Sequence, residues 1–271
     1  MKPADKSKKL VKAMLYGAPG TKKTRTAASA VFVEEMGPVL ILEQAANPLS
    51  IRDYDPAPYI VTIENMKDYN EPYDWLIKGQ PEQHVFATWL KQNNLWCDEP
   101  FRTVIIDGIS QVQTFAIRAI KPGIDAKPGD VPPFTELRDF NALLSMMTNW
   151  AYKYMMLPDM HVILTALEYE KQDKAGNIYR RPLLWGQGES MISSYAYIVM
   201  RLTSSEYMDT RTKSAVATDL EKVKQSRTVG FLKQTASFYA KEQYGMLDEN
   251  GEEMNYMFDP TMQKIWDAIG G

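Results

Sequence analysis

A short segment rich in glycine and lysine carries the clearest chemical signal in the sequence. It reads, in order, Gly17, Ala18, Pro19, Gly20, Thr21, Lys22, Lys23 and Thr24. Consecutive main-chain N–H groups in such a turn, leading into a helix, form a cradle for an anion, and a lysine neutralises phosphate charge. The segment therefore predicts a site for ATP, with Lys23 on the phosphates and Thr24 on Mg²⁺, against the alternative of an ordinary strand-to-helix turn with surface lysines.

Position 22 departs from the phosphate-loop pattern G-x-x-x-x-G-K-[ST], which has glycine where this chain has Lys22. Glycine permits the closest approach of the backbone to a ligand, so a Cβ at this position would crowd the phosphates. An additional ammonium would instead strengthen the attraction for phosphate. The sequence leaves both readings open, and it indicates nucleotide binding more firmly than hydrolysis.

A carboxylate closes an apolar run downstream of this segment, at Asp107 in F-R-T-V-I-I-D. Phosphate-loop proteins need such a group to hold Mg²⁺ through water, so Asp107 is the candidate metal residue together with Thr24. The alternative is an acid that only caps the turn after a buried strand. The downstream position relative to the phosphate loop favours the metal role.

Two further residues close predicted strands and are candidate catalytic groups. Glu43 ends the run 38–43, where ligands collect at the carboxyl ends of parallel strands, and it could orient water or be a solvated strand-end acid. Thr165 ends the run 161–165 and could contact the γ-phosphate or be a satisfied core hydroxyl. His161 starts that run, at the opposite end, so a structural role is expected for it.

The elements that must position these residues follow an α/β pattern. Six apolar runs are candidate strands, at residues 10–16, 38–43, 59–63, 103–107, 161–165 and 197–202. Helical periodicity lies between them, at residues 23–36, 83–92 and 139–157. This alternation predicts a three-layer fold in which helices cover both faces of a mostly parallel central sheet.

The remaining segments complete a single predicted domain spanning residues 1–271. Residues 1–8 are expected to be a flexible N-terminus, and the proline- and glycine-rich stretch 121–137 a surface insertion. Residues 170–182 read as a polar loop with a turn near 175–177. Residues 203–271 are expected to form a C-terminal β extension, with strands near 229–232 and 237–240 and a terminal helix near 261–269.

Composition narrows the function classes. The 271 residues are 45% hydrophobic and 24% charged with a formal net charge of -3, which argues against a uniformly basic coat for nucleic acid. The single cysteine, Cys97, excludes an intrachain disulfide framework, and zinc-ligand spacing is absent from the sequence. The sequence lacks a secretory signal and an apolar stretch long enough to span a membrane, so we expect a soluble, cytoplasmic protein without a membrane partner.

Four segments taken together resemble the phage AAA/RecA-like ATPases, including the Sak-type single-strand annealing proteins. They are Y-G-A-P-G-T-K-K-T at 16–24, V-I-I-D at 104–107, H-V-I-L-T-A at 161–166 and Y-R-R-P at 179–182. The likeness covers residues 10–248, and the order and spacing of the motifs carry it. It implies a RecA-like core that binds ATP with Mg²⁺ and acts on single-stranded DNA in phage recombination, in the host cytoplasm.

The resemblance also assigns roles to individual residues. It implies that Lys23 and Thr24 bind phosphate and metal, that Asp107 is the Walker B acid and that Thr165 is the sensor. The family's water-activating glutamate falls just beyond Glu43, where this chain has Gln44, Ala45 and Ala46. Lys241, in F-Y-A-K, matches a lysine that reaches a neighbouring subunit's nucleotide, although Gln243 replaces the usual arginine. The implied assembly is a homo-oligomeric ring or filament.

For single-stranded DNA, the segment 170–182 is the main candidate because it combines charge with stacking surface, helped by the nearby Trp185. Its candidate DNA-binding residues are Lys171, Lys174, Tyr179, Arg180 and Arg181. A second basic run contains Lys222, Lys224, Arg227 and Lys233. Such runs are often only solvated faces. A single-strand DNA-binding protein is a further partner that the resemblance implies.

Three readings of function follow. The first is a RecA-like ATPase that oligomerises on single-stranded DNA and uses ATP to control annealing or strand exchange. The second is a nucleotide-binding regulatory or scaffold protein with little or no turnover, indicated by Lys22 and the missing glutamate. The third is a nucleotide or small-molecule kinase, which lacks an obvious arginine-rich lid unless Arg180 and Arg181 serve as one.

Overall fold

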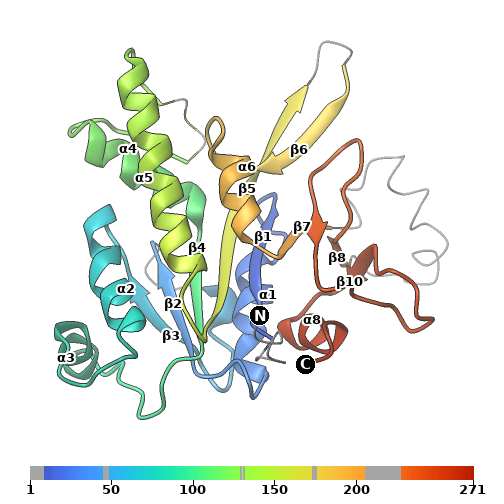
Figure 1. Ribbon diagram of the computed structural model, residues 1–271, viewed down its shortest axis with the longest axis horizontal. Coiled ribbons are helices and arrows are strands. Elements are labelled where there is room, and N and C mark those ends of the chain that lie inside the picture. The colour runs from blue at the N-terminus through green and yellow to red at the C-terminus, as the bar shows by residue number, and fades with distance from the viewer. Residues whose placement is uncertain (1–8, 45–48, 129, 131, 173–175, 205–226) are drawn as a thin grey trace, which may run out of the picture.

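A computed structural model describes residues 9–44, 49–128, 130, 132–172, 176–204 and 227–271. Its centre is one sheet with the strand order β10-β8-β7-β1-β5-β4-β2-β3 (Figure 1). The strands of this path are β1 (Lys12–Gly17), β2 (Val39–Glu43), β3 (Tyr59–Thr62), β4 (Thr103–Asp107), β5 (His161–Gln172), β7 (Ile198–Ser204), β8 (Thr228–Phe231) and β10 (Tyr256–Phe258). All pairings from β7 to β3 along this path are parallel, whereas β8 and β10 are antiparallel.

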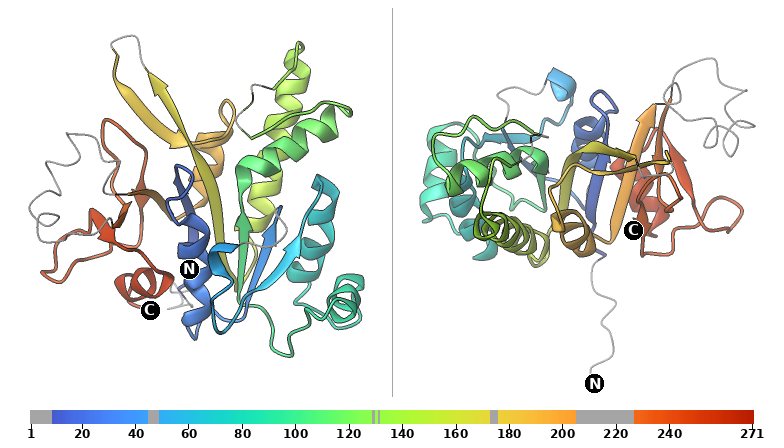
Figure 2. Two further views of the ribbon diagram at one scale, coloured as in Figure 1. Left: turned by 180° about the vertical axis from the view of Figure 1, so that it is seen from behind. Right: turned by 90° about the horizontal axis from the view of Figure 1, so that it is seen from above.

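Helices cover both faces of the sheet, so the predicted α/β class is confirmed. Apolar side chains on one face pack with helices α2 (Asn70–Ile77), α3 (Val85–Gln92), α4 (Ile109–Ile120), α5 (Leu137–Met155) and α6 (Gly188–Tyr195). The other face packs with α1 (Lys23–Ala28) and α8 (Met262–Ala268). Figure 2 shows α1 on one side of the sheet and α5 and α6 on the other.

The strands in the middle of the sheet are continuous apolar runs because both of their faces are covered. Every residue of β1 is buried, and so is every residue of β2. Alternation of polar and apolar residues is absent from such strands, since neither face meets water. The sequence therefore located these strands, to within two residues at their amino ends.

Several elements differ from the sequence expectation. The helix expected at 23–36 ends at Ala28 and continues as a 3₁₀ helix, η1 (Ser29–Phe32). Helices α2, α4 and α6 were not expected, and two more 3₁₀ helices, η2 (Leu49–Ile51) and η3 (Met66–Tyr69), precede α2. In the segment 121–137, Ala126 and Phe134 are buried in the core, because they fill space beside α4 and α5.

The polar loop expected at 170–182 is instead a β-hairpin. Strand β5 continues well past the main sheet and pairs antiparallel with β6 (Ile178–Pro182). The hairpin projects beyond the edge of the sheet where β1 and β4 end (Figure 1). Further on, the expected strand at 237–240 is reduced to an isolated bridge between Phe238 and Arg180, and the short strand β9 (Lys241–Glu242) follows it. In the segment 170–182, the cross-strand hydrogen bonds between β5 and β6 outweigh the polar composition that had suggested a loop.

The register brings the ends of four parallel strands to one edge. Glu43 lies beside Asp107, Asp107 beside Thr165, and Thr165 beside Leu15. Strand β1 then ends at Gly17, beside Leu167 and Leu202. Because carboxyl ends of parallel strands share an edge, residues far apart in sequence meet at the loop that follows β1.

Candidate phosphate-binding site

The loop between β1 and α1 has the backbone of a tight turn. Gly20 adopts a φ of 82°, a conformation that glycine reaches without a steric penalty. The N–H and the hydroxyl of Thr21 both donate to the carbonyl oxygen of Ala18, at 3.3 and 2.8 Å. At Gly17 the constraint is space, because an added Cβ would lie 2.2 Å from the Leu202 carbonyl oxygen. The loop therefore curls tightly against β7.

Lys22 stands in the left-handed region, with φ 62° and ψ 25°, as the residue that precedes α1. Its side chain is exposed and makes no capping hydrogen bond. A residue with a Cβ is strained in this conformation by about 1 kcal/mol relative to glycine. This explains in backbone terms why the phosphate-loop pattern has glycine here.

Lys23 begins α1 and folds back over the loop. Its ammonium donates to the carbonyl oxygens of Gly17 at 3.0 Å and Ala18 at 2.9 Å. Burial lowers the pKa of Lys23, and the Asp107 and Glu168 carboxylates oppose that shift. The ammonium is thus held at the mouth of the loop, beside the first-turn N–H groups of α1, which lack partners within the helix.

Asp107 links two hydroxyl groups. One of its carboxylate oxygens accepts from the Thr24 hydroxyl at 2.5 Å, and the other accepts from the Thr165 hydroxyl. A hydroxyl and a carboxylate are hard oxygen ligands of the kind that Mg²⁺ takes, usually with water and substrate phosphates as the other ligands. The donor set of Thr24 and Asp107 therefore fits a magnesium ion.

Glu43 is buried, and its Oε2 atom has no hydrogen-bond partner among the described residues. Burial, and to a lesser extent the adjacent Asp107 carboxylate, raise the pKa of Glu43 to about 8. A buried polar atom without a partner is rare and needs a reason. Here the reason is the cavity that Glu43 lines, where a bound cation or water would be its partner.

These groups converge on one cavity of about 500 Å³. Its walls come from α1, from the ends of β2 and β4, from the middle of β5, and from the start of α4. The lining residues are Lys23, Thr24, Glu43, Gln44, Asp107, Gly108, Ser110, Gln111, Pro128, Thr165, Ala166 and Leu167. The structure thus brings together Lys23, Thr24, Glu43, Asp107 and Thr165, all candidates from the sequence.

Sequence reasoning missed Gly108 and Ser110 as members of this cavity. The main-chain N–H of Gly108 donates to the Gln44 side chain at 2.8 Å. The Ser110 hydroxyl accepts from the Leu167 N–H and donates to the Leu183 carbonyl oxygen, both at 3.1 Å. Their position immediately after Asp107 was the available signal, because a loop that follows a strand-end acid shares its surroundings.

The hairpin places the candidate DNA residues on two different faces. Cross-strand pairing sets Tyr169 opposite Arg181 and Lys171 opposite Tyr179, so these four side chains share one face. The Arg181 guanidinium lies 4.5 Å from the centre of the Tyr179 ring and 3.1 Å from the Glu189 carboxylate. This face is both aromatic and basic.

Arg180 belongs to the other face of the hairpin. Its guanidinium lies 2.9 Å from Glu170 and 3.6 Å from Glu168. Glu168 also binds Arg201 of β7 at 2.6 Å, with both of those side chains buried. Arg180 is therefore engaged in an ion-pair network that ties the hairpin to the main sheet.

The other predicted cations lie elsewhere. Lys241 donates to the carbonyl oxygens of Ala196 at 2.7 Å and Ser194 at 3.2 Å, so it caps the end of α6. Lys241 pairs with Val199 near the start of β7, so it lies away from the phosphate loop of the same chain. Arg227 lies 3.5 Å from Asp259, and Lys233 lies 2.9 Å from Glu253. Lys174, Lys222 and Lys224 fall outside the described residues.

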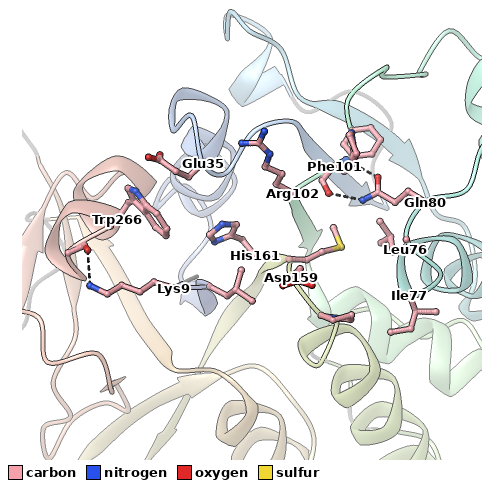
Figure 3. A pocket seen from close by; sticks show the side chains of 17 residues that line it. Lys9, Glu35, Leu76, Ile77, Gln80, Phe101, Arg102, Asp159, His161 and Trp266 are labelled. Carbon is pink, nitrogen blue, oxygen red and sulfur yellow. Dashed lines mark hydrogen bonds between the residues drawn. The ribbon is translucent and has the colours of Figure 1, made fainter. Parts of the chain in front are cut away.

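A larger cavity, of about 1110 Å³, lies at the opposite edge, where β1, β4 and β5 begin (Figure 3). Polar side chains in its wall bind main-chain groups: Lys9 the carbonyl oxygen of Gly270 at 2.7 Å, and Gln80 both the N–H and the carbonyl of Phe101. The Nδ1 atom of His161 accepts from the Val11 N–H at 3.0 Å, in agreement with a structural role.

No protein-family profile matches this chain, and no curated protein matches it. Its structure is similar to that of the flagellar accessory protein FlaH from Methanocaldococcus jannaschii, with a TM-score of 0.41 and 10% identity over 92% of this chain and 85% of that one. It is also similar to the RadB recombinase, with a TM-score of 0.39 and 11% identity over 91% and 86% of the two chains. Likenesses of this degree concern the fold alone.

The part of the chain that the structure describes contains no helix with the length and apolar character needed to cross a bilayer.

Proposed function

We propose that this protein is a P-loop ATPase that binds ATP with Mg²⁺ in the loop of residues 17–24. The observation that carries the proposal is the convergence of Lys23, Thr24 and Asp107 on one cavity at the carboxyl edge of a parallel sheet. A turn of main-chain N–H groups, an ammonium, a hydroxyl and a carboxylate are the parts that hold a magnesium-bound triphosphate.

The proposal gives each group a chemical task. Lys23 exchanges its two loop carbonyl oxygens for phosphate oxygens, and Thr24 and Asp107 hold Mg²⁺, which would neutralise charge on the phosphates. Thr165 orients Asp107 and, as a lining residue of the cavity, would donate to a γ-phosphate bound there. Glu43 orients the attacking water, because it is the buried carboxylate in this cavity that lacks a partner.

Titration with a fluorescent ATP analogue in the presence of Mg²⁺ tests the proposal. Lys23→Ala should weaken binding about thirtyfold or more, because a charge-assisted contact contributes about 2 kcal/mol. Lys78→Ala is the matched control, since Lys78 is an exposed lysine bound to Asp74 on α2, away from the loop. Equal affinities of the parent and Lys23→Ala, or no binding by the parent, would refute the proposal.

We further propose that the protein is a phage recombination ATPase that binds single-stranded DNA, promotes annealing or strand exchange and assembles into a ring or filament. Support comes from the hairpin face of Tyr169, Lys171, Tyr179 and Arg181, which offers two aromatic rings for base stacking beside two cations for phosphate. In such an assembly Lys241 would have to leave its carbonyl partners to reach a neighbouring nucleotide.

Fluorescence anisotropy with a labelled oligonucleotide tests the DNA proposal. Tyr179→Ala should weaken binding about tenfold, because stacking on one base contributes about 1–3 kcal/mol. Tyr152→Ala is the control, since Tyr152 is an exposed tyrosine on α5 rather than on the hairpin. Affinity should also fall steeply with salt in the parent. Binding that is insensitive to both salt and Tyr179→Ala would contradict the hairpin as the interface.

A nucleotide-binding regulator with little turnover is the second candidate. One observation favours it: the raised pKa of about 8 leaves Glu43 mostly protonated at neutral pH until a cation binds, and a protonated carboxyl cannot accept a proton from water. A steady-state phosphate-release assay separates the two. Turnover that Glu43→Gln abolishes supports the ATPase, and tight ATP binding without phosphate release supports the regulator.

A further inference from the structure

Gln44 is the residue after Glu43, and both ends of its side-chain amide are engaged at the wall of the cavity. Its Oε1 atom accepts from the Gly108 N–H at 2.8 Å, and its Nε2 group donates to the Tyr69 hydroxyl. Gly108 directly follows Asp107 in the chain. One glutamine therefore connects the buried aromatic core to the peptide next to the candidate metal ligand.

The anchor at the far end of this connection is rigid. Tyr69 is 1% exposed, and its carbonyl oxygen accepts from the Tyr154 hydroxyl at 2.7 Å. Its ring also packs edge-on against Trp150 and Tyr154, with ring centres 5.3 and 6.0 Å away. A tyrosine held by packing on several sides presents its hydroxyl at a fixed point.

The near end of the connection has little freedom either. An ideal Cβ built on Gly108 would lie 3.0 Å from the Thr165 hydroxyl and 3.2 Å from the Thr165 carbonyl oxygen. Gly108 is thus confined between Gln44 on one side and Thr165 on the other. The peptide that carries the Gly108 N–H also joins Gly108 to Asp107, so the orientation of this peptide affects where the Asp107 carboxylate lies.

We propose that Gln44 is a positioning residue that fixes the peptide after Asp107 and so sets the Asp107 carboxylate at the distance from Thr24 that Mg²⁺ requires. The inference rests on the proposed function. In this role Gln44 does not contact the nucleotide, and it differs from a water-activating residue because both ends of its amide are bound to protein groups, the Gly108 N–H and the Tyr69 hydroxyl. Residues that orient a metal ligand change metal affinity about 10- to 100-fold when they are lost.

If Gln44 contributed only to packing, its replacement would affect nucleotide binding in a different way. Loss of packing between η3 and β4 would lower stability and weaken all nucleotide binding equally. Loss of positioning instead weakens the binding that depends on Mg²⁺ and spares the binding measured in chelator. The dependence on Mg²⁺ is therefore the informative measurement.

The test is titration of Mg²⁺ into protein with a fluorescent ATP analogue, read as nucleotide binding. Gln44→Met, which keeps the size and removes both hydrogen bonds, should require about tenfold more Mg²⁺ while its affinity in chelator stays within about twofold of the parent. Gln44→Glu should need no more Mg²⁺ than the parent, because a carboxylate still accepts from Gly108 and from the Tyr69 hydroxyl.

Gln113→Met is the matched control, since the buried Gln113 also accepts a main-chain N–H, from Trp185 at 2.6 Å. It should keep the parent's Mg²⁺ dependence. If Gln44→Met does not fold, Tyr69→Phe removes only the anchor and should shift the Mg²⁺ requirement about fivefold.

Parental Mg²⁺ dependence in Gln44→Met, an equal loss in chelator, or an equal shift in Gln113→Met would overturn the positioning role while leaving the proposed function intact. Failure of the parent to bind the analogue would instead remove the proposed function, and the inference with it.

Discussion

At the carboxyl edge of the sheet, a cavity of about 500 Å³ brings the phosphate-loop lysine together with carboxylates and hydroxyl groups, whereas a cavity of about 1110 Å³ at the amino edge is lined by a mixture of apolar and polar side chains. In the larger one, polar side chains such as Lys9, Gln80 and His161 are already bound to main-chain groups. In the smaller one, Glu43 keeps an unpartnered oxygen. The convergence of an ammonium, two carboxylates and hydroxyl groups, with one carboxylate oxygen left unpartnered, distinguishes the candidate site rather than its volume.

The largest expected difference between the two edges concerns their glycines. Gly17→Ala should lower the free energy of unfolding by about 3 kcal/mol, because the new Cβ would meet the Leu202 carbonyl oxygen at 2.2 Å. Gly79→Ala, at the amino edge, should cost only about 1 kcal/mol, since its φ of 77° is unfavourable but the space is open. Denaturant unfolding of both variants measures this, and equal losses would contradict the tight curl of the phosphate loop.

The second difference is the sign of the pH dependence. The pKa of Glu43 rises from 4.5 to about 8 on folding. Its contribution to the free energy of unfolding is therefore complete below pH 4.5 and is lost as the pH rises to 8. The pKa of His161 falls from 6.5 to about 4 on folding because the ring is buried. Its contribution to the free energy of unfolding is therefore present above pH 6.5 and is lost as the pH falls to 4. The two edges should therefore lose stability in opposite directions.

Unfolding free energies measured across pH 4–9 test this. Glu43→Gln should flatten the decline between pH 4.5 and 8 by about 2 kcal/mol, less than the full shift because water and ions in the cavity screen the charge. His161→Asn, which keeps an acceptor for the Val11 N–H, should flatten only the acid decline. A Glu43→Gln profile parallel to the parent's would show that Glu43 is not buried in its neutral form.

The smallest expected difference concerns two residues in the left-handed region. Lys22→Gly should stabilise the protein by about 1 kcal/mol, and Asp159→Gly, in the wall of the larger cavity, by about 0.5 kcal/mol because aspartate tolerates this conformation better. Thermal unfolding measures both gains. Only Lys22→Gly should change ATP affinity: tighter binding indicates relief of crowding, and weaker binding indicates that the Lys22 ammonium attracts phosphate. Unchanged affinity would place Lys22 outside the site.

Much of the fold could be predicted because its central strands are buried on both faces. Runs such as 38–43 and 103–107 stand out as uninterrupted apolar segments, and their end residues Glu43 and Asp107 follow directly. Helix α4 was missed because Ile109–Ile120 mixes buried polar residues, including Ser110 and Gln113, with apolar ones. The hairpin was missed because β5 and β6 outside the sheet are polar, and only their mutual pairing makes them strands.

By itself, the sequence determined the phosphate-loop composition, the strand-end acids and the α/β class, because these depend on local residue types and hydrophobic periodicity. Only the tertiary structure decided that Glu43 lies beside Asp107, that Gln44 spans from Tyr69 to Gly108, and that Arg180 faces Glu168 rather than solvent. These are contacts between segments far apart in the chain. Strand order and register set them, and a single sequence does not encode either in any local pattern.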